Sequence, residues 1–208
     1  MKRLFLYALF AVTLAAGRAA TIGDLFVAEN YGIFNTLTPT MRVVMLNHYR
    51  DGDTARVANN MAEDGSRIVS LDDRNITVET SVAARVQLRL LTQGKDSLVM
   101  AVETVLTPYP DSRVSFYGTD WKPRLASGHF KMPAMTDFLL PTASKDIKRR
   151  LAASLDFTMI EVEVAGDTLV ARHHLDKMMD KNEYATFAPY LRRELRYTIK
   201  GTKISPTR

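Results

Sequence analysis

One short segment carries the residue types best suited to binding a ligand. Trp121 is the only tryptophan of the chain, and Tyr117, Asp120 and Lys122 lie close to it. The two rings can form an aromatic platform for a sugar or a lipid, and the charged neighbours can add polar contacts. We therefore predict a ligand site at Tyr117, Asp120, Trp121 and Lys122. The alternative is a structural corner, in which Asp120 caps a turn and Trp121 closes the edge of the core.

The residues that usually carry catalysis show no recognisable pattern. The chain has four histidines and no cysteine, which excludes a cysteine nucleophile, thiolate metal sites and disulfides. His173 and His174 are neighbours in a predicted strand, so they point to opposite faces and do not form one simple metal site. No zinc-protease, serine-hydrolase, phosphate-loop or dinucleotide motif occurs. We predict no catalytic residue, no metal and no cofactor. A hydrolase whose Asp, Glu and His residues meet only in the folded chain is the alternative.

The start of the chain has the features of a secretory signal. Lys2 and Arg3 precede the uncharged stretch 4–16, and Gly17 and Ala19 are small residues at the positions that signal peptidase reads. The stretch is shorter than the ~20 residues that span a bilayer. We therefore expect cleavage after Ala19, export to the periplasm or the medium, and no later transmembrane segment. Because no cysteine is available for lipid attachment, a lipoprotein is excluded.

Signal removal changes the charge that the folded protein carries. The whole chain has 28 basic and 23 acidic residues, for a formal net charge of +5. The signal contains three basic residues (Lys2, Arg3 and Arg18) and no acid, so 25 basic residues face 23 acidic ones, and the net charge becomes +2. This near balance predicts no nucleic-acid partner.

Basic side chains still gather at two places in the mature chain. Lys148, Arg149 and Arg150 lie on the predicted outer face of a helix, and residues 192–196 hold three arginines. Such runs are typical of a solvated face. In an exported protein they can also contact anionic lipid headgroups, so peripheral membrane contact through Lys148, Arg149 and Arg150 is our second binding hypothesis.

The pattern of apolar residues predicts the elements that must position these groups. Helical spacing favours helices over 21–30, over 39–51 after the Thr38 cap, over 145–155 after Ser144, and over 177–188. In the second of these helices, Met41, Val44, Met45 and His48 form the expected inward stripe.

From about Arg67 the period changes to two, which is typical of strands. Short connections favour antiparallel pairing, so we expect a meander of four or five strands. After an irregular connection over 120–141, a hairpin over 158–173 and a strand over 195–199 follow. The prediction is one α+β domain over residues 20–208, with an antiparallel meander sheet and two to four helices.

Several segments in order resemble a known family. They are TIGDLF at 21–26, QLRLL at 87–91, FYGTDWKP at 116–123, LDFTMIEV at 155–162 and APYLRRELRY at 188–197. Together they resemble domain-of-unknown-function family 3256, uncharacterised exported proteins of anaerobic gut-type bacteria. The resemblance covers nearly the whole mature chain, and the TDWKP segment is its most specific part. It implies a cell-envelope or secreted location and transfers no catalytic residue.

Three triplets, starting at Asp53, Asp96 and Asp167, continue with a hydroxyl residue and a small or aliphatic one. They look like the O-glycosylation acceptor of exported proteins in the lineage that the resemblance implies. Turns also enrich aspartate and serine, which is the alternative. A glycan-specific mass shift that a triple Ser/Thr→Ala variant lacks would establish the modification.

These observations favour an exported, non-catalytic envelope module that binds a lipid, a glycan or another envelope protein. A carrier should have a deep apolar pocket lined by residues such as Met100, Val102 and Phe116. An enzyme should have a cleft in which titratable groups meet. A purely structural component should expose an apolar patch.

Overall fold

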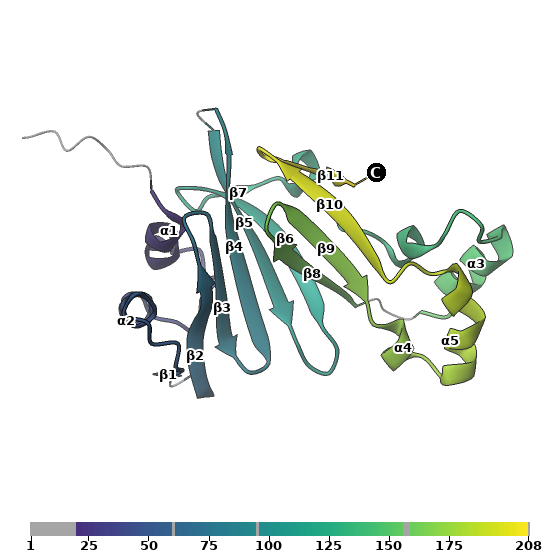
Figure 1. The fold of residues 1–208 in the computed structure, drawn as a ribbon, viewed down its shortest axis with the longest axis horizontal. Helices are drawn as coiled ribbons and strands as arrows, with labels where there is room; N and C mark the ends of the chain where they lie inside the picture. Colours follow the sequence, from purple (N-terminus) through teal and green to yellow (C-terminus); the bar gives the residue numbers. More distant parts are fainter. Residues whose placement is uncertain (1–19, 60, 95, 156–158, 208) are drawn as a thin grey trace, which may run out of the picture.

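The computed structural model describes residues 20–59, 61–94, 96–155 and 159–207, and in this part the chain forms two antiparallel sheets and five α-helices (Figure 1). The predicted signal, 1–19, and the first residue of the predicted hairpin, Thr158, lie outside the described residues. The α+β fold with an antiparallel meander is confirmed. The last strands form a second sheet, which the sequence did not predict.

The larger sheet is a meander of seven strands in sequence order. Its strands are β1 (Val57–Asn59), β2 (Ala62–Leu71), β3 (Asn75–Ser81), β4 (Ala84–Gln93), β5 (Asp96–Val105), β6 (Asp111–Gly118) and β7 (Pro123–Arg124). The smaller sheet has the order β11-β10-β9-β8. Its strands are β8 (Ile160–Ala165), β9 (Thr168–His173), β10 (Glu194–Lys200) and β11 (Lys203–Pro206).

Two N-terminal helices cover one face of the larger sheet. In α1 (Ile22–Ala28), Thr21 and Asp24 form a reciprocal capping box, and α2 (Pro39–Arg50) begins with Thr38 as cap and proline in the first turn, as predicted. Both helices pack on strands β2 to β5 through a common apolar core. Ile33, Phe34 and Leu37 of the loop between the helices belong to the same core.

A buried ion pair joins the two helices. The carboxylate of Glu29, directly after α1, accepts hydrogen bonds from the backbone N–H groups of residues 31–34. Its Oε2 also lies 3.0 Å from Nη1 of Arg42 on α2, and Arg42 donates to the backbone carbonyls of Phe26 and Glu29. Both side chains are at most 4% exposed. Burial lowers the pKa of the Arg42 guanidinium, and the charge of Glu29 opposes that shift.

This pair corrects the predicted orientation of α2. Arg42, Met45 and Leu46 face the core, whereas Val44 is 38% exposed and His48 is exposed beside Asp53. The predicted inward stripe did not include Arg42, since a charged side chain normally stays in water. Here Glu29 supplies a counter-charge, and the helix is turned to bring Arg42 inward.

The smaller sheet docks on the opposite face of the larger one through its edge strand β8. The N–H groups of Ile160, Val162 and Val164 point away from β9 and donate to Asp111 Oδ1, Ser112 Oγ and Gln87 Oε1, at 3.1, 2.8 and 3.0 Å. These three side chains take the place of a neighbouring strand. Between the sheets, apolar residues of β5 and β6 pack against β8 and β9 in a second core.

The remaining helices lie beyond the far end of the smaller sheet (Figure 1). They are α3 (Lys145–Ala153), α4 (Leu175–Met178) and α5 (Lys181–Phe187). Short 3₁₀ helices are formed by Ala126–Gly128, which lies against β6, by Met135–Phe138 and by Ala188–Tyr190. None of the helices in the described ranges is long and apolar enough to cross a membrane.

Candidate functional site

The segment predicted as an aromatic platform forms a buried corner at the end of β6. Trp121 is 3% exposed, its Nε1 donates to the carbonyl of Leu25 on α1, and its ring centre lies 5.6 Å from that of Tyr117. Tyr117 is also buried, and burial raises the pKa of its phenol. Sugar stacking requires an open ring face, so we place the strongest candidate site elsewhere. Ligand binding by these four residues stays a prediction.

The charged members of the segment hold this corner in shape. Asp120 Oδ1 accepts from the backbone N–H of Lys122, which lowers the pKa of the Asp120 carboxyl, and Lys122 and Arg124 add their charges in the same direction. Trp121 has a φ of 60°, a conformation uncommon for a bulky residue. A side chain at Gly118 would meet the ends of the Asp120 and Arg124 side chains, which would have to shift to make room for it.

The burial of Trp121 can be measured by its fluorescence, because it is the only tryptophan. We expect native emission that acrylamide quenches weakly, with strong quenching after unfolding. Trp121→Phe should lower the free energy of unfolding by ~1–3 kcal/mol because the Leu25 carbonyl loses its donor. Equal quenching of the native and unfolded protein would place the ring in solvent and contradict this geometry.

The apolar pocket expected of a carrier is not formed at its predicted residues. Met100, Val102 and Phe116 are at most 1% exposed and belong to the core between the two sheets. The smaller sheet covers this face of the larger sheet, so its side chains occupy the space next to Met100, Val102 and Phe116. This expectation is corrected: any apolar binding surface must lie outside the inter-sheet core.

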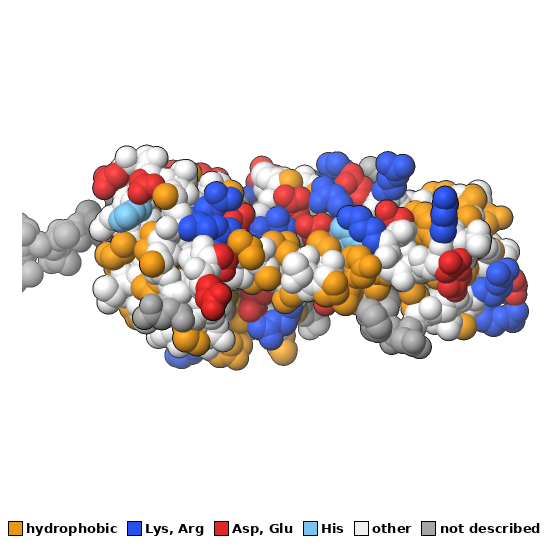
Figure 2. All heavy atoms as spheres, turned by 90° about the horizontal axis from the view of Figure 1, so that it is seen from below, with side chains coloured by type: hydrophobic (Ala, Val, Ile, Leu, Met, Phe, Trp, Pro, Cys, Tyr) orange, Lys and Arg blue, Asp and Glu red, His pale blue; other side chains and the backbone are white. Residues whose placement is uncertain are grey.

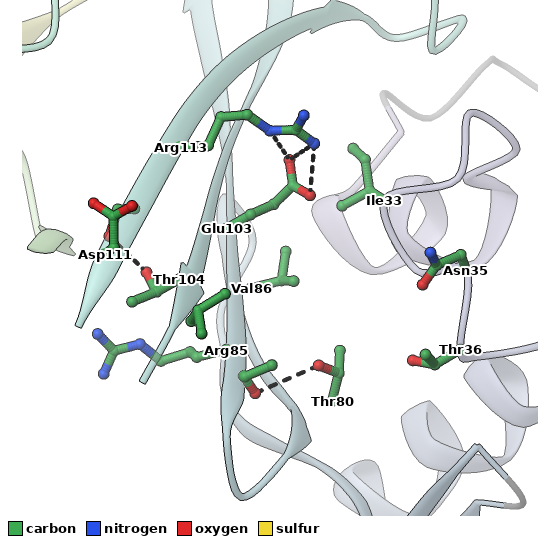
Figure 3. A pocket seen from close by; sticks show the side chains of 13 residues that line it. Ile33, Asn35, Thr36, Thr80, Arg85, Val86, Glu103, Thr104, Asp111 and Arg113 are labelled. Atoms are coloured by element: carbon green, nitrogen blue, oxygen red, sulfur yellow. Dashed lines mark hydrogen bonds and ion pairs between the residues drawn. The ribbon is translucent and has the colours of Figure 1, made fainter. Parts of the chain in front are cut away.

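A pocket of about 400 Å³, lined by both polar and apolar side chains, lies where strands β3 and β5 end and β4 and β6 begin, facing the loop that contains Ile33, Asn35 and Thr36 (Figure 3). Arg113 forms a two-pronged ion pair with Glu103 across its mouth, with distances of 2.9 and 3.0 Å from Nη2. Thr104 and Ser112 share a hydrogen bond deeper in the pocket. Each of these groups is bonded to another, which suits structural support better than catalysis.

A second charged cluster lies close to this pocket but does not open into it. Glu161 bridges Arg85, at 2.9 Å, and His174, at 3.2 Å. Of these three, only Arg85 lines the pocket. Among the described residues, no group of three or more His, Asp or Glu side chains is placed to hold a metal ion.

The strongest candidate site is a groove of about 940 Å³ along β10. One wall is the connection after β7, which bonds to β11 at its start, through Ile204 N–H and His129 O, and to the beginning of β10 at its end, through Arg192 N–H and Phe138 O. The apolar lining comes from Phe130, Met132, Pro133, Leu195, Tyr197, Ile204 and Pro206.

Charged side chains surround this apolar lining, and most of the acidic charge is already engaged. Glu194 is paired with Arg196 at 2.6 Å and with Arg172 at 3.4 Å. Asp137 accepts the backbone N–H of Ala134 at 2.8 Å. By contrast, Lys131 and Arg192 form no ion pair with any side chain in the described ranges. The groove therefore offers two free cations beside an apolar floor.

The base of the groove is rigidly held. Phe130 packs edge-on against Tyr197, with ring centres 5.1 Å apart, and burial raises the pKa of Tyr197. His173, beneath the start of β10, lies with Nε2 3.1 Å from the Arg192 carbonyl and accepts from Leu175 N–H at Nδ1, which fits a neutral ring protonated at Nε2. Burial lowers the pKa of His173 and favours that neutral form.

The second binding hypothesis concerns exposed residues. Lys148, Arg149 and Arg150 lie on the outer face of α3, and Arg149 is paired with Asp146 in the same helix. Figure 2 shows basic side chains at the right-hand end of the molecule, with acidic and basic side chains interspersed elsewhere on that face. Among the acceptor hydroxyls of the three triplets, Thr54 is exposed, and Ser97 and Thr168 are half-buried.

Comparison with known proteins agrees with this fold and assigns no activity. A family model described as "Protein of unknown function (DUF3256)" matches residues 14–204. The chain is similar to a solved structure described as "Structure of a domain of an uncharacterized protein from Porphyromonas gingivalis W83", with 23% identity and a TM-score of 0.72. The match covers 89% of this chain and 97% of that chain, and at this identity it shows the fold alone. None of the curated proteins matches.

Proposed function

The chain belongs to the DUF3256 family, and for this member we propose an exported, non-catalytic protein of the cell envelope that binds an apolar ligand in the groove along β10. The groove is the observation that carries the proposal. Its volume of about 940 Å³ lies within the range of sites for small organic ligands, and its lining combines an apolar floor with a few polar groups. The signal-like first 19 residues support export.

The alternative of a hydrolase has less support. Enzyme sites bring titratable groups together at a cleft, where some of them have no protein partner and can contact a substrate. In the pocket beside the loop between α1 and α2, Glu103 is held by Arg113, and nearby Glu161 is held by Arg85 and His174. In the groove, the acidic side chains are similarly engaged. A binding role therefore explains the arrangement better than catalysis.

Native mass spectrometry of the protein purified from the exported fraction tests the proposal. We expect a non-covalent adduct on the wild-type chain that organic solvent removes. Met132→Trp places an indole in the groove and should abolish the adduct. Met61→Trp is the matched control, because Met61 is 72% exposed in the turn before β2 and does not line the groove. Bare polypeptide mass for wild type and control, or an adduct on all three proteins, would refute the proposal.

Peripheral membrane contact through α3 is a separate proposal with its own test. Reversal of Lys148, Arg149 and Arg150 to glutamate should weaken binding to phosphatidylglycerol vesicles at least ~10-fold, since each basic residue near an anionic surface contributes ~1 kcal/mol. Vesicle co-sedimentation at low salt measures this. The control replaces Arg50, Arg74 and Lys122 with glutamate. These residues are exposed outside α3, and their reversal changes the net charge by the same amount. Equal losses in both triple variants would show a net-charge effect and exclude a specific α3 surface.

A further inference from the structure

We propose that the occupant of the groove along β10 is a single-chain amphiphile with an anionic head, of the long-chain carboxylate type. This inference rests on the proposed function and adds the chemical class of the ligand. Three features of the groove carry it: an apolar floor continuous with the core, two free cations at the rim, and a backbone edge directed into the groove.

The floor of the groove can bind an extended apolar chain. Phe130, Tyr197 and Ile204 are each buried and belong to the core between the sheets, so their outer surfaces form a firm apolar base. Met132 and Leu195 are half-buried and pack on the same core. Transfer of a methylene group from water to such a surface contributes ~0.8 kcal/mol, so a long alkyl chain supplies most of the binding energy.

The rim accounts for the sign of the head group. Three cationic side chains and two anionic ones line the groove. Arg196 and Glu194 neutralise each other, which leaves Lys131 and Arg192 against Asp137, whose carboxylate already accepts a backbone N–H. Arg192 uses only its backbone groups in contacts with neighbouring segments, so its guanidinium is available to an anion. Charge complementarity therefore favours a carboxylate over a neutral or cationic head.

The backbone of β10 adds a donor at the same place. Arg192 N–H bonds to Phe138 O, and Arg196 O accepts from Thr207 N–H, both on the side facing away from β9. Backbone groups alternate along a strand, so the N–H and C=O of Glu194, midway between these residues, point into the groove. An N–H beside two cations suits an anionic oxygen. Among the described residues on this edge of β10, only Glu194 has unpaired backbone groups, because Arg192 and Arg196 on either side are already bonded. One residue is too short a stretch for an added peptide strand.

Titration of the delipidated protein with hexadecanoate tests the inference. We expect saturable 1:1 binding by calorimetry, at least 10-fold tighter than binding of hexadecanol or hexadecylamine, which keep the chain and change the head. The double variant Lys131→Ala with Arg192→Ala should weaken the binding of hexadecanoate at least ~10-fold and change the affinity for hexadecanol by no more than ~2-fold. Arg193→Ala with Lys200→Ala removes two exposed cations of the same region that do not line the groove, and should leave both affinities unchanged.

The outcomes separate this inference from the proposed function. Equal affinity for the three head groups, or no effect of the Lys131 and Arg192 substitutions, would overturn the anionic head. A host-derived adduct that Met132→Trp removes, together with no hexadecanoate binding, would overturn the inference and leave the proposed function in place. An acidic peptide as the adduct would overturn both the inference and the apolar ligand of the proposed function. Absence of both adduct and titration signal would overturn both.

Discussion

Glu29→Gln is expected to lower the free energy of unfolding by about 3–5 kcal/mol, the loss typical of removing one partner from a buried ion pair. Arg42 would keep its charge at 3% exposure with no counter-charge within reach. Glutamine keeps one oxygen that can accept the backbone N–H groups of residues 31–33, while its amide nitrogen replaces the oxygen that accepts from Arg42 and from Phe34 N–H. Urea unfolding at pH 7, followed through Trp121 fluorescence, measures it.

The double variant Glu29→Gln with Arg42→Met separates the ion pair from the local fold. Because removal of both charges leaves no unpaired ion, the double variant should be more stable than Glu29→Gln alone. Arg149→Ala is the surface control: this side chain is largely exposed, and loss of its pair with Asp146 should change stability by less than ~1 kcal/mol. A loss below 1 kcal/mol for Glu29→Gln would show that the buried pair is dispensable.

The same ion pair marks the limit of sequence-based reasoning about the helices. The caps at Thr38 and Ser144 are local, since each side chain bonds three residues ahead, and the sequence predicted these two helix starts correctly. The helix predicted over 177–188 was wrong in its bounds, because this part of the chain forms two helices, α4 and α5. Val44 and His48 were wrongly placed on the inward face of α2, because the rotation of this helix depends on Glu29, 13 residues before Arg42. Hydropathy alone places an arginine outside and gives no sign of a partner in another element.

The meander was predictable, and the division into two sheets was not. Alternating apolar residues and short turns specify antiparallel neighbours from β2 to β6. The docking of β8 depends on Gln87, Ser112 and Asp111, which lie 49 to 77 residues from the groups that they bind. Such matches between side chains and a strand edge leave no periodic signal in the sequence.

The candidate site was only partly visible in the sequence. The arginines at 192–196 stood out as a basic cluster, but their relation to an apolar floor depends on the connection over 130–137 crossing beside β10. Trp121 stood out by rarity, and the structure uses it to join α1 to the larger sheet. Rarity and charge thus indicated important positions, while exposure decided which of them offers a binding surface.

The docking of the smaller sheet should depend strongly on one amide. Gln87 is 7% exposed; its Oε1 accepts from Val164 N–H at 3.0 Å and its Nε2 donates to Val164 O at 3.3 Å. Gln87→Leu keeps a side chain of similar size and removes both groups that bond to Val164, the amide oxygen and the amide nitrogen. Since each unpaired backbone group costs about 1–3 kcal/mol, we expect a loss of about 2–4 kcal/mol in urea unfolding. Hydrogen exchange should accelerate at the Val164 amide, because its acceptor is gone.

Two variants distinguish this docking bond from a general effect on β4. Gln87→Glu keeps an acceptor for Val164 N–H, so exchange at this amide should stay slow, but it buries a carboxylate against Val164 O, so its loss of stability should be at least that of Gln87→Leu. Thr77→Val removes only the weak 3.4 Å contact of Gln87 with the Thr77 hydroxyl and should change stability by no more than ~0.5 kcal/mol. Unchanged exchange at Val164 in Gln87→Leu would mean that packing alone holds β8 on the larger sheet. The edge of β8 lies on a sheet face, so no neighbouring strand of the described chain is available to bond its backbone groups. Only side-chain amides, hydroxyls and carboxylates can form hydrogen bonds with these groups, and the variants should therefore differ.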